Sequence, residues 1–137
     1  MVPGRQPAQV RILLDTHTFL WWNEADPRLS KKALVLLADP ANILLLSVVS
    51  AWELVLKTQT GKMRLAESPN VYVPTRMAYY AMQALPVTLA HVLECESLPL
   101  HHRDPFDRLL IAQAMIEDVP IVTADPEFRH YSIKALW

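Results

Sequence analysis

Three short apolar runs, each next to helix-like sequence, constrain the fold of this chain more than any other feature. The runs are VRILL at residues 10–14, ILLL at 43–46 and VPIVT at 119–123. Continuous apolar runs of this length are typical of strands that are buried on both faces. Strands that alternate with helices predict an α/β fold, in which a mostly parallel central sheet lies between helical layers.

The segments between these runs predict helices that are separated by prolines and a glycine. Ser30 is a suitable cap for one of them, and Gly61 follows the end of the next. Residues 68–100 contain four prolines, and their pattern suggests a hairpin of two helices. The expected helices span residues 16–22, 30–38, 48–59, 76–84, 89–96 and 105–117.

Length and composition predict one folded domain over residues 10–137, preceded by a loose N-terminal tail at 1–9. The formal net charge of −1 gives no overall attraction to nucleic acid, so any such binding must be local. The single cysteine, Cys95, excludes an internal disulfide and fits a cytoplasmic location. No uninterrupted apolar run reaches the length of about 20 residues that a membrane span needs, so no membrane crossing is expected.

Four acidic residues follow the predicted strands or lie early in the helices after them. Asp15 ends the first run, Glu53 lies in the helix after the second, and Asp107 and Asp125 flank the third. Because the carboxyl ends of parallel strands form one edge of a sheet, these side chains are expected to converge there. Four carboxylates in one crevice would repel each other unless a hard cation such as Mg²⁺ or Mn²⁺ neutralised them.

Each of these residues also has a purely structural interpretation. Asp15 suits a helix cap, and Asp125 suits a turn before proline. In SAWE, Ser50 and Glu53 fit a capping box, but Ser47 could start the helix instead and leave Glu53 free. Local sequence leaves these alternatives open, and only the joint placement of the four residues favours a metal site.

The motif HRDPFDRLLIAQA, residues 102–114, carries two aspartates at the start of a helix. Asp104 precedes Pro105, and proline favours the first helical position, which places Asp104 as the helix cap. Asp107 then occupies the third helical position, where its carboxylate is able to face the crevice. We therefore expect one carboxylate to begin the helix and the other to bind the metal.

Four segments, LLDTHTFLWW, SVVSAWEL followed by KTQTGK, LPLHHRDPFDRLLIAQA and VPIVTADPEF, together resemble the PIN-domain ribonucleases, and among them the VapC-type toxins of type II toxin-antitoxin pairs. The resemblance runs over residues 11–136. It implies a PIN-like three-layer α/β/α sandwich and an endoribonuclease that depends on Mg²⁺ or Mn²⁺. By position, the acidic residues of the family fall on Asp15, Glu53, Asp107 and, at the more variable fourth place, Asp125 or Glu127.

Residues near the acidic positions are candidates for supporting roles. Hydroxyls beside the acidic residues suggest hydrogen bonds to them, and basic side chains suggest phosphate or partner contacts, although Lys57 also suits a solvated helix end. His102 is read as a neighbour of the site or a surface residue, and Trp21, Trp22 and Trp52 as core or interface rather than base-stacking residues. The supporting candidates are Thr16, Ser47, Thr123, Lys57, Lys62 and Arg108.

Together with the acidic residues, the resemblance implies the toxin of a toxin-antitoxin pair, in which a metal-activated water cleaves RNA without a covalent enzyme intermediate. The resemblance further implies a homodimer and a cognate antitoxin protein as partner. Two alternatives stay open: a PIN nuclease that acts in RNA maturation or on structured DNA, and a binding module without activity. The short chain disfavours the first, and the presence of all four acidic residues disfavours the second.

Overall fold

The computed structural model describes residues 10–137, and the tail expected at residues 1–9 lies outside these residues. A five-stranded sheet, in which every neighbouring pair is parallel, forms its centre. β1 occupies the middle and pairs with β2 on one side and β4 on the other. In spatial order the strands are β3 (Gln83–Leu85), β2 (Asn42–Ser47), β1 (Val10–Leu14), β4 (Ile121–Val122) and β5 (Ala135–Leu136).

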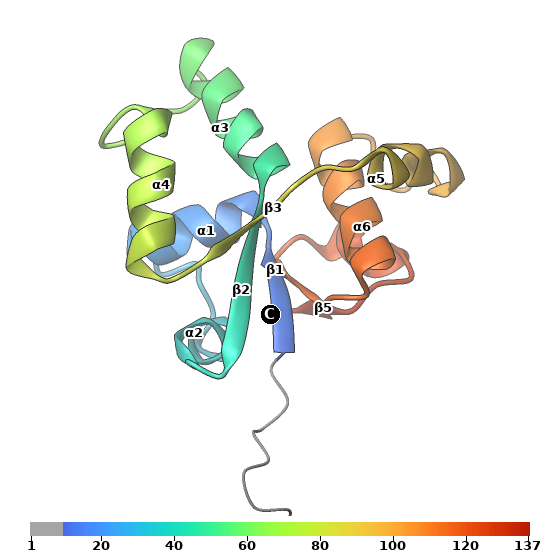
Figure 1. The fold of residues 1–137 in the computed structure, drawn as a ribbon, viewed down its shortest axis with the longest axis horizontal. Helices are drawn as coiled ribbons and strands as arrows, with labels where there is room; N and C mark the ends of the chain where they lie inside the picture. Colours follow the sequence, from blue (N-terminus) through green and yellow to red (C-terminus); the bar gives the residue numbers. More distant parts are fainter. Residues whose placement is uncertain (1–9) are drawn as a thin grey trace, which may run out of the picture.

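Helices cover both faces of the sheet because successive strand residues point to opposite faces and nearly all are apolar. Ile12 and Leu14 of β1 pack into one core, whereas Leu13 between them packs into the other. Figure 1 shows α1, α2 and α4 on one side of the strands, and α5 and α6 on the other. The helices are α1 (Thr16–Asn23), α2 (Lys31–Ala38), α3 (Val48–Gln59), α4 (Pro69–Tyr79), α5 (Leu89–Glu94) and α6 (Pro105–Glu117).

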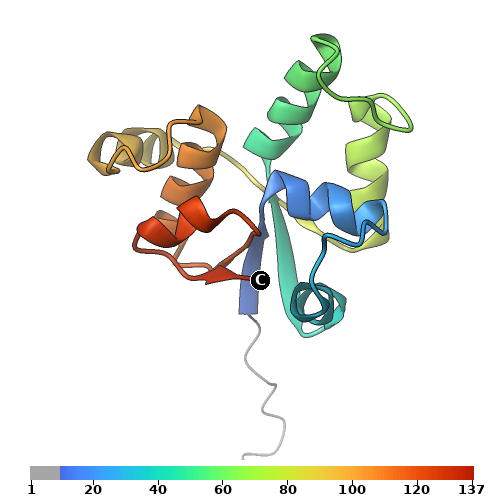
Figure 2. The ribbon, with the colours of Figure 1, turned by 180° about the vertical axis from the view of Figure 1, so that it is seen from behind.

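The predicted α/β class and the parallel sheet between helical layers are confirmed. α3 leaves the end of β2 and extends beyond the sheet, where it lies beside α4, an arrangement that both views show (Figures 1 and 2). Two short 3₁₀ turns, η1 (Cys95–Ser97) and η2 (Pro126–His130), complete the α6 side. No helix within residues 10–137 is long and apolar enough to cross a membrane.

The prediction for the middle of the chain is wrong in its first half. A helix was expected over residues 76–84, but α4 ends at Tyr79 and residues Gln83–Leu85 form the edge strand β3. α4 begins early because Pro69 suits its first turn, and it continues through Pro74. Tyr72 and Val73 are buried in the core, so packing compensates for the hydrogen bond that Pro74 cannot make.

Candidate metal centre

Asp15 lies at the carboxyl end of β1, next to the end of β4. After β1 the chain continues to β2 on one side of β1, and it later returns from β3 to β4 on the other side. Such a switch point is where parallel α/β sheets form their binding crevices. Asp15 is 5% exposed, and its Oδ2 accepts a hydrogen bond of 2.9 Å from the Thr123 hydroxyl. Although it precedes α1, its side chain makes no capping hydrogen bond. Burial raises the pKa of Asp15, and the charge of Glu53 adds to the effect.

The sequence left open whether Glu53 forms a capping box with Ser50. It does not, because Ser47 is the cap of α3. The Ser47 hydroxyl accepts from the Val49 backbone N–H at 3.1 Å. Ser50 instead accepts a hydrogen bond of 2.8 Å from the Thr16 hydroxyl, inside the protein. Glu53 therefore lies in the second turn of α3, where it is 3% exposed.

One oxygen of Glu53 is held, and the other has no partner. Oε2 lies 2.6 Å from Nζ of Lys57, one turn further along α3. Oε1 is buried and has no hydrogen-bond partner among the described residues. A buried carboxylate oxygen without a partner is costly, and a bound cation would remove that cost.

Asp104 and Asp107 differ in their contacts at the start of α6. Oδ1 of Asp104 accepts from the backbone N–H groups of Phe106 (2.8 Å) and Asp107 (3.2 Å), so Asp104 is the helix cap. The carboxylate of Asp107 makes no capping bond, and its Oδ2 lies 2.9 Å from Nε2 of His102.

His102 joins Asp107 to Asp125. Its Nε2 is 3.1 Å from Oδ2 of Asp125, and the ligand atoms of these three residues lie within 4.8 Å of one another. The sequence reading missed this histidine as a ligand candidate, although it stands two residues before the helix cap. Glu127, the alternative outer acidic residue, is exposed, and its carboxylate lies 3.8 Å from His130 instead.

The electrostatics show that the acidic side chains share one environment. Burial raises the pKa of Asp107 to about 8, and the nearby charges of Asp15, Asp104, Glu53 and Asp125 push in the same direction. A carboxylate that is hard to ionise beside other carboxylates needs a cation to hold its charged form. The donor set, carboxylate oxygens with one imidazole, suits Mg²⁺ or Mn²⁺.

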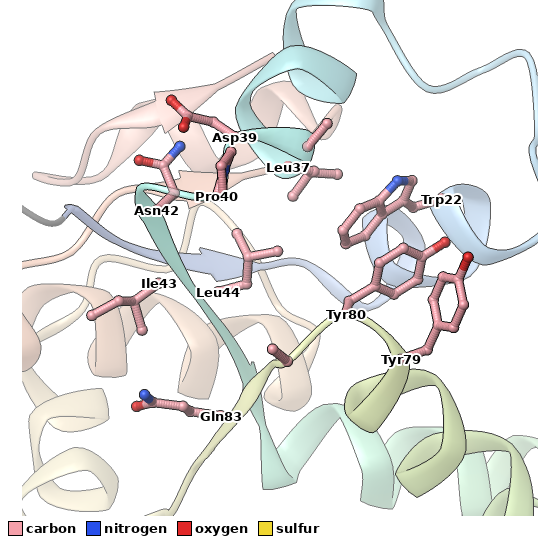
Figure 3. Close-up of a pocket in the computed structure, with 12 residues that line it drawn as sticks. Trp22, Leu37, Asp39, Pro40, Asn42, Ile43, Leu44, Tyr79, Tyr80 and Gln83 are labelled. Carbon is pink, nitrogen blue, oxygen red and sulfur yellow. The ribbon is translucent and has the colours of Figure 1, made fainter.

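A pocket of about 370 Å³ opens onto this centre, between Asp15, Asp107 and Asp125 on one side and α1 with the turn after it on the other. A larger pocket, about 620 Å³, lies at the opposite, amino ends of β2 and β3 (Figure 3). Its walls carry the stacked rings of Trp22 and Tyr80 but only one acidic side chain, Asp39. The smaller pocket is therefore the better candidate for metal chemistry.

Five of the six supporting residues predicted from sequence separate into three groups. Thr123 donates a hydrogen bond to Asp15, and Lys57 holds Glu53. Partial burial lowers the pKa of Lys57, but the hydrogen bond that Lys57 donates to Glu53 and the negative charge of Glu53 raise this pKa overall. Thr16 and Ser47 support α3 through hydroxyl hydrogen bonds. Lys62 is exposed in the loop after α3, so a phosphate or partner contact there stays a prediction.

Arg108 has a different role from the predicted phosphate contact. Its guanidinium donates to four main-chain carbonyls, between 2.9 and 3.2 Å away, in the segment before α6. One of these belongs to His102, so Arg108 holds the segment that presents His102 to the two aspartates. The sequence could not show this, because the path of residues 95–102 depends on tertiary packing.

Comparison with known proteins agrees with this fold. The PIN domain family matches residues 12–134. VapBC2 from Rickettsia felis, bound to a DNA fragment from their promoter, contains a chain of similar structure: the TM-score is 0.69, with 16% identity over 93% of this chain and 98% of that one. DNA-bound VapBC from Salmonella typhimurium (0.66, 15%, 93% and 97%) and FitAcB from Neisseria gonorrhoeae (0.62, 16%, 92% and 96%) are also similar. Comparison with curated proteins gives no significant match.

The parallel sheet and the acidic centre at its carboxyl edge define an α/β domain with a site suited to a divalent cation. The chain belongs to the PIN domain family, whose match covers most of its length. The resemblance of the sequence to the PIN-domain family is thereby confirmed, and the solved structures share its fold.

Proposed function

We propose that this protein is a metal-dependent endoribonuclease and the toxin of a toxin-antitoxin pair. The observation that carries the proposal is that Asp15, Asp107 and Asp125 line one pocket at the carboxyl edge of the sheet, with buried Glu53 near enough for its charge to raise the pKa of Asp107. Membership of a family whose members are typically nucleases supports it, as does the fold shared with chains of VapBC and FitAcB.

The residues fit Mg²⁺ or Mn²⁺, which the four carboxylates would hold, because a buried oxygen of Glu53 lacks a partner and the pKa of Asp107 is high without a cation. When bound, such an ion polarises a phosphodiester and lowers the pKa of a water molecule. The chain's own residues fix the ligands in place: Thr123 orients Asp15, Lys57 orients Glu53, and the Asp104 cap positions the first turn that carries Asp107.

Direct attack by water fits the composition of the pocket. The described residues that line it include no serine, cysteine or threonine that could serve as a nucleophile. We propose that water hydrolyses the phosphodiester in one displacement, without a covalent enzyme intermediate.

A protein partner is also part of the proposal. Val48, Trp52 and Val55 expose apolar surface on α3, and Trp52 is 55% exposed. Such surface suits the cognate antitoxin or a second copy of the chain, and we infer both partners from the VapC resemblance. We also propose a cytoplasmic location, where a toxin that cleaves RNA would act. A small neighbouring gene for a DNA-binding protein would support the toxin role.

RNA cleavage by the purified protein with Mg²⁺ or Mn²⁺ tests the proposed activity. Asp15→Asn and Asp107→Asn should each abolish cleavage. Asp118→Asn is the matched control, since Asp118 ends the same helix at the far end and its left-handed backbone (φ 53°) tolerates asparagine. Cleavage by the first two variants at the parent rate would show that the acidic centre is not the active site.

A further inference from the structure

The pocket over the acidic centre has a second wall of different chemistry. His17 and Trp21 stand one helical turn apart on α1, and Arg28 lies in the turn that follows α1. The guanidinium carbon of Arg28 is 4.6 Å from the centre of the Trp21 ring, so the cation stacks on the indole. Trp21 is itself braced by an edge contact with Trp137, 5.7 Å between ring centres. The wall is thus an aromatic platform that carries a cation.

Arg28 is held in one orientation before any ligand arrives. Its Nε and Nη2 donate to the two carboxylate oxygens of Asp26, at 3.1 and 2.8 Å. The backbone N–H of Arg28 donates to the same carboxylate at 2.9 Å. A guanidinium has five N–H groups, and two of them serve Asp26, which leaves three. Stacking and ion pairing together fix a planar donor whose remaining N–H groups are available.

A cation in this position offsets part of the negative charge of the pocket. Asp15, Asp107 and Asp125 line the other side, and even a bound divalent cation leaves a site rich in negative charge facing an anionic substrate. Arg28 is the one lysine or arginine among the described residues that line the pocket. Its pairing with Asp26 is exposed and screened by solvent, so it orients Arg28 without preventing a phosphate contact.

We propose that Arg28, stacked on Trp21, binds a phosphate of the RNA strand next to the one that is cleaved. The inference rests on the proposed nuclease function and adds a substrate contact that the acidic centre cannot supply. Arginine matches phosphate oxygens with its fork of N–H groups, and preorganisation reduces the entropy lost on binding. Arg28 thereby positions the strand, while the carboxylates hold the metal at the reacting phosphate.

Arg28→Ala tests the proposal by steady-state cleavage of one single-stranded RNA at several salt concentrations. We expect KM to rise about tenfold, as for the loss of a charge-assisted hydrogen bond, and kcat to stay within about twofold. The slope of log(kcat/KM) against log salt should become shallower by about 0.7, the value for one phosphate contact on a single strand. Arg28→Lys retains the charge but not the fork, so it should keep the slope and raise KM by a smaller factor.

Arg76→Ala is the matched control. Arg76 stacks on Tyr72 at 4.2 Å and pairs with Glu67, the same set of contacts, but it lies on α4 away from the acidic pocket. The Arg76→Ala variant should have the parent KM and the parent slope of log(kcat/KM) against log salt. If the parent protein cleaves RNA and Arg28→Ala has the parent KM and slope, the phosphate contact is wrong and the nuclease function stands. If the parent cleaves no RNA, the proposed function fails and the contact falls with it.

Discussion

Replacing Asp107 by asparagine should make the metal-free protein more stable while removing its response to metal. Asp107 is a carboxyl whose pKa rises from 3.8 to about 8 on folding, mainly through burial and then through neighbouring carboxylates. The folded state therefore binds a proton that the unfolded state releases between these two pH values. Stability contributed by this group is complete below pH 3.8 and is lost as the pH rises to about 8.

The size of this effect follows from the pKa difference. pH 7 is 3.2 pH units above the pKa of 3.8 that Asp107 has in the unfolded chain. This difference corresponds to a loss of about 4 kcal/mol in the free energy of unfolding. At pH 5 the same relation gives about 1.5 kcal/mol. Asparagine is neutral in both states, so the variant should exceed the parent in stability by up to these amounts, and the gap should widen with pH.

Urea unfolding in EDTA at pH 5 and pH 7 measures the gap, with Asp118→Asn as the control that makes the same substitution at an exposed site. Saturating Mn²⁺ should reverse the order at pH 7, because only the parent gains binding energy from the ion. A variant that is less stable than the parent at pH 7 without metal, or a gap that does not grow with pH, would refute the reasoning.

Three further substitutions test the supporting contacts. Thr123→Val removes the hydroxyl that orients Asp15 and should weaken Mn²⁺ binding about 10- to 100-fold, measured by calorimetry; unchanged affinity would exclude this role. Lys57→Met leaves both oxygens of buried Glu53 without a donor and should lower the free energy of unfolding in EDTA by about 1–3 kcal/mol, by urea titration. Arg108→Ala should cost about 2–4 kcal/mol in the same assay, since four carbonyls lose their donor, and should leave the salt dependence of RNA cleavage unchanged.

The sequence predicted the parts of the fold that local patterns determine. β1 and β2 each end in a run of buried residues, at 12–14 and 44–47, and α6 begins where Pro105 and the Asp104 cap require it. Edge strands lack this signal: β3 has two exposed residues among its three, and β5 has two residues, so neither shows a periodicity. Their strand conformation comes from pairing with β2 and β4, which is a tertiary effect.

In the candidate site, too, local patterns predicted some residues, and tertiary contacts determine the others. The positions of Asp15, Glu53 and Asp107 relative to strands and helices were readable, because strand ends and caps have sequence signatures. The choice between Ser47 and Ser50 as the start of α3 was not, since both serines suit a cap and only packing against Thr16 takes Ser50 inside. His102 and Arg28 reach the site through loops, whose paths depend on contacts distant in sequence.

Calorimetric titration of the protein with Mn²⁺ tests the central claim, that the four carboxylates form one metal site, most directly. The parent and Asp118→Asn should bind the ion with equal heat and affinity, whereas Asp15→Asn should lose the binding. Absence of binding heat in the parent, or equal binding by Asp15→Asn, would contradict the account.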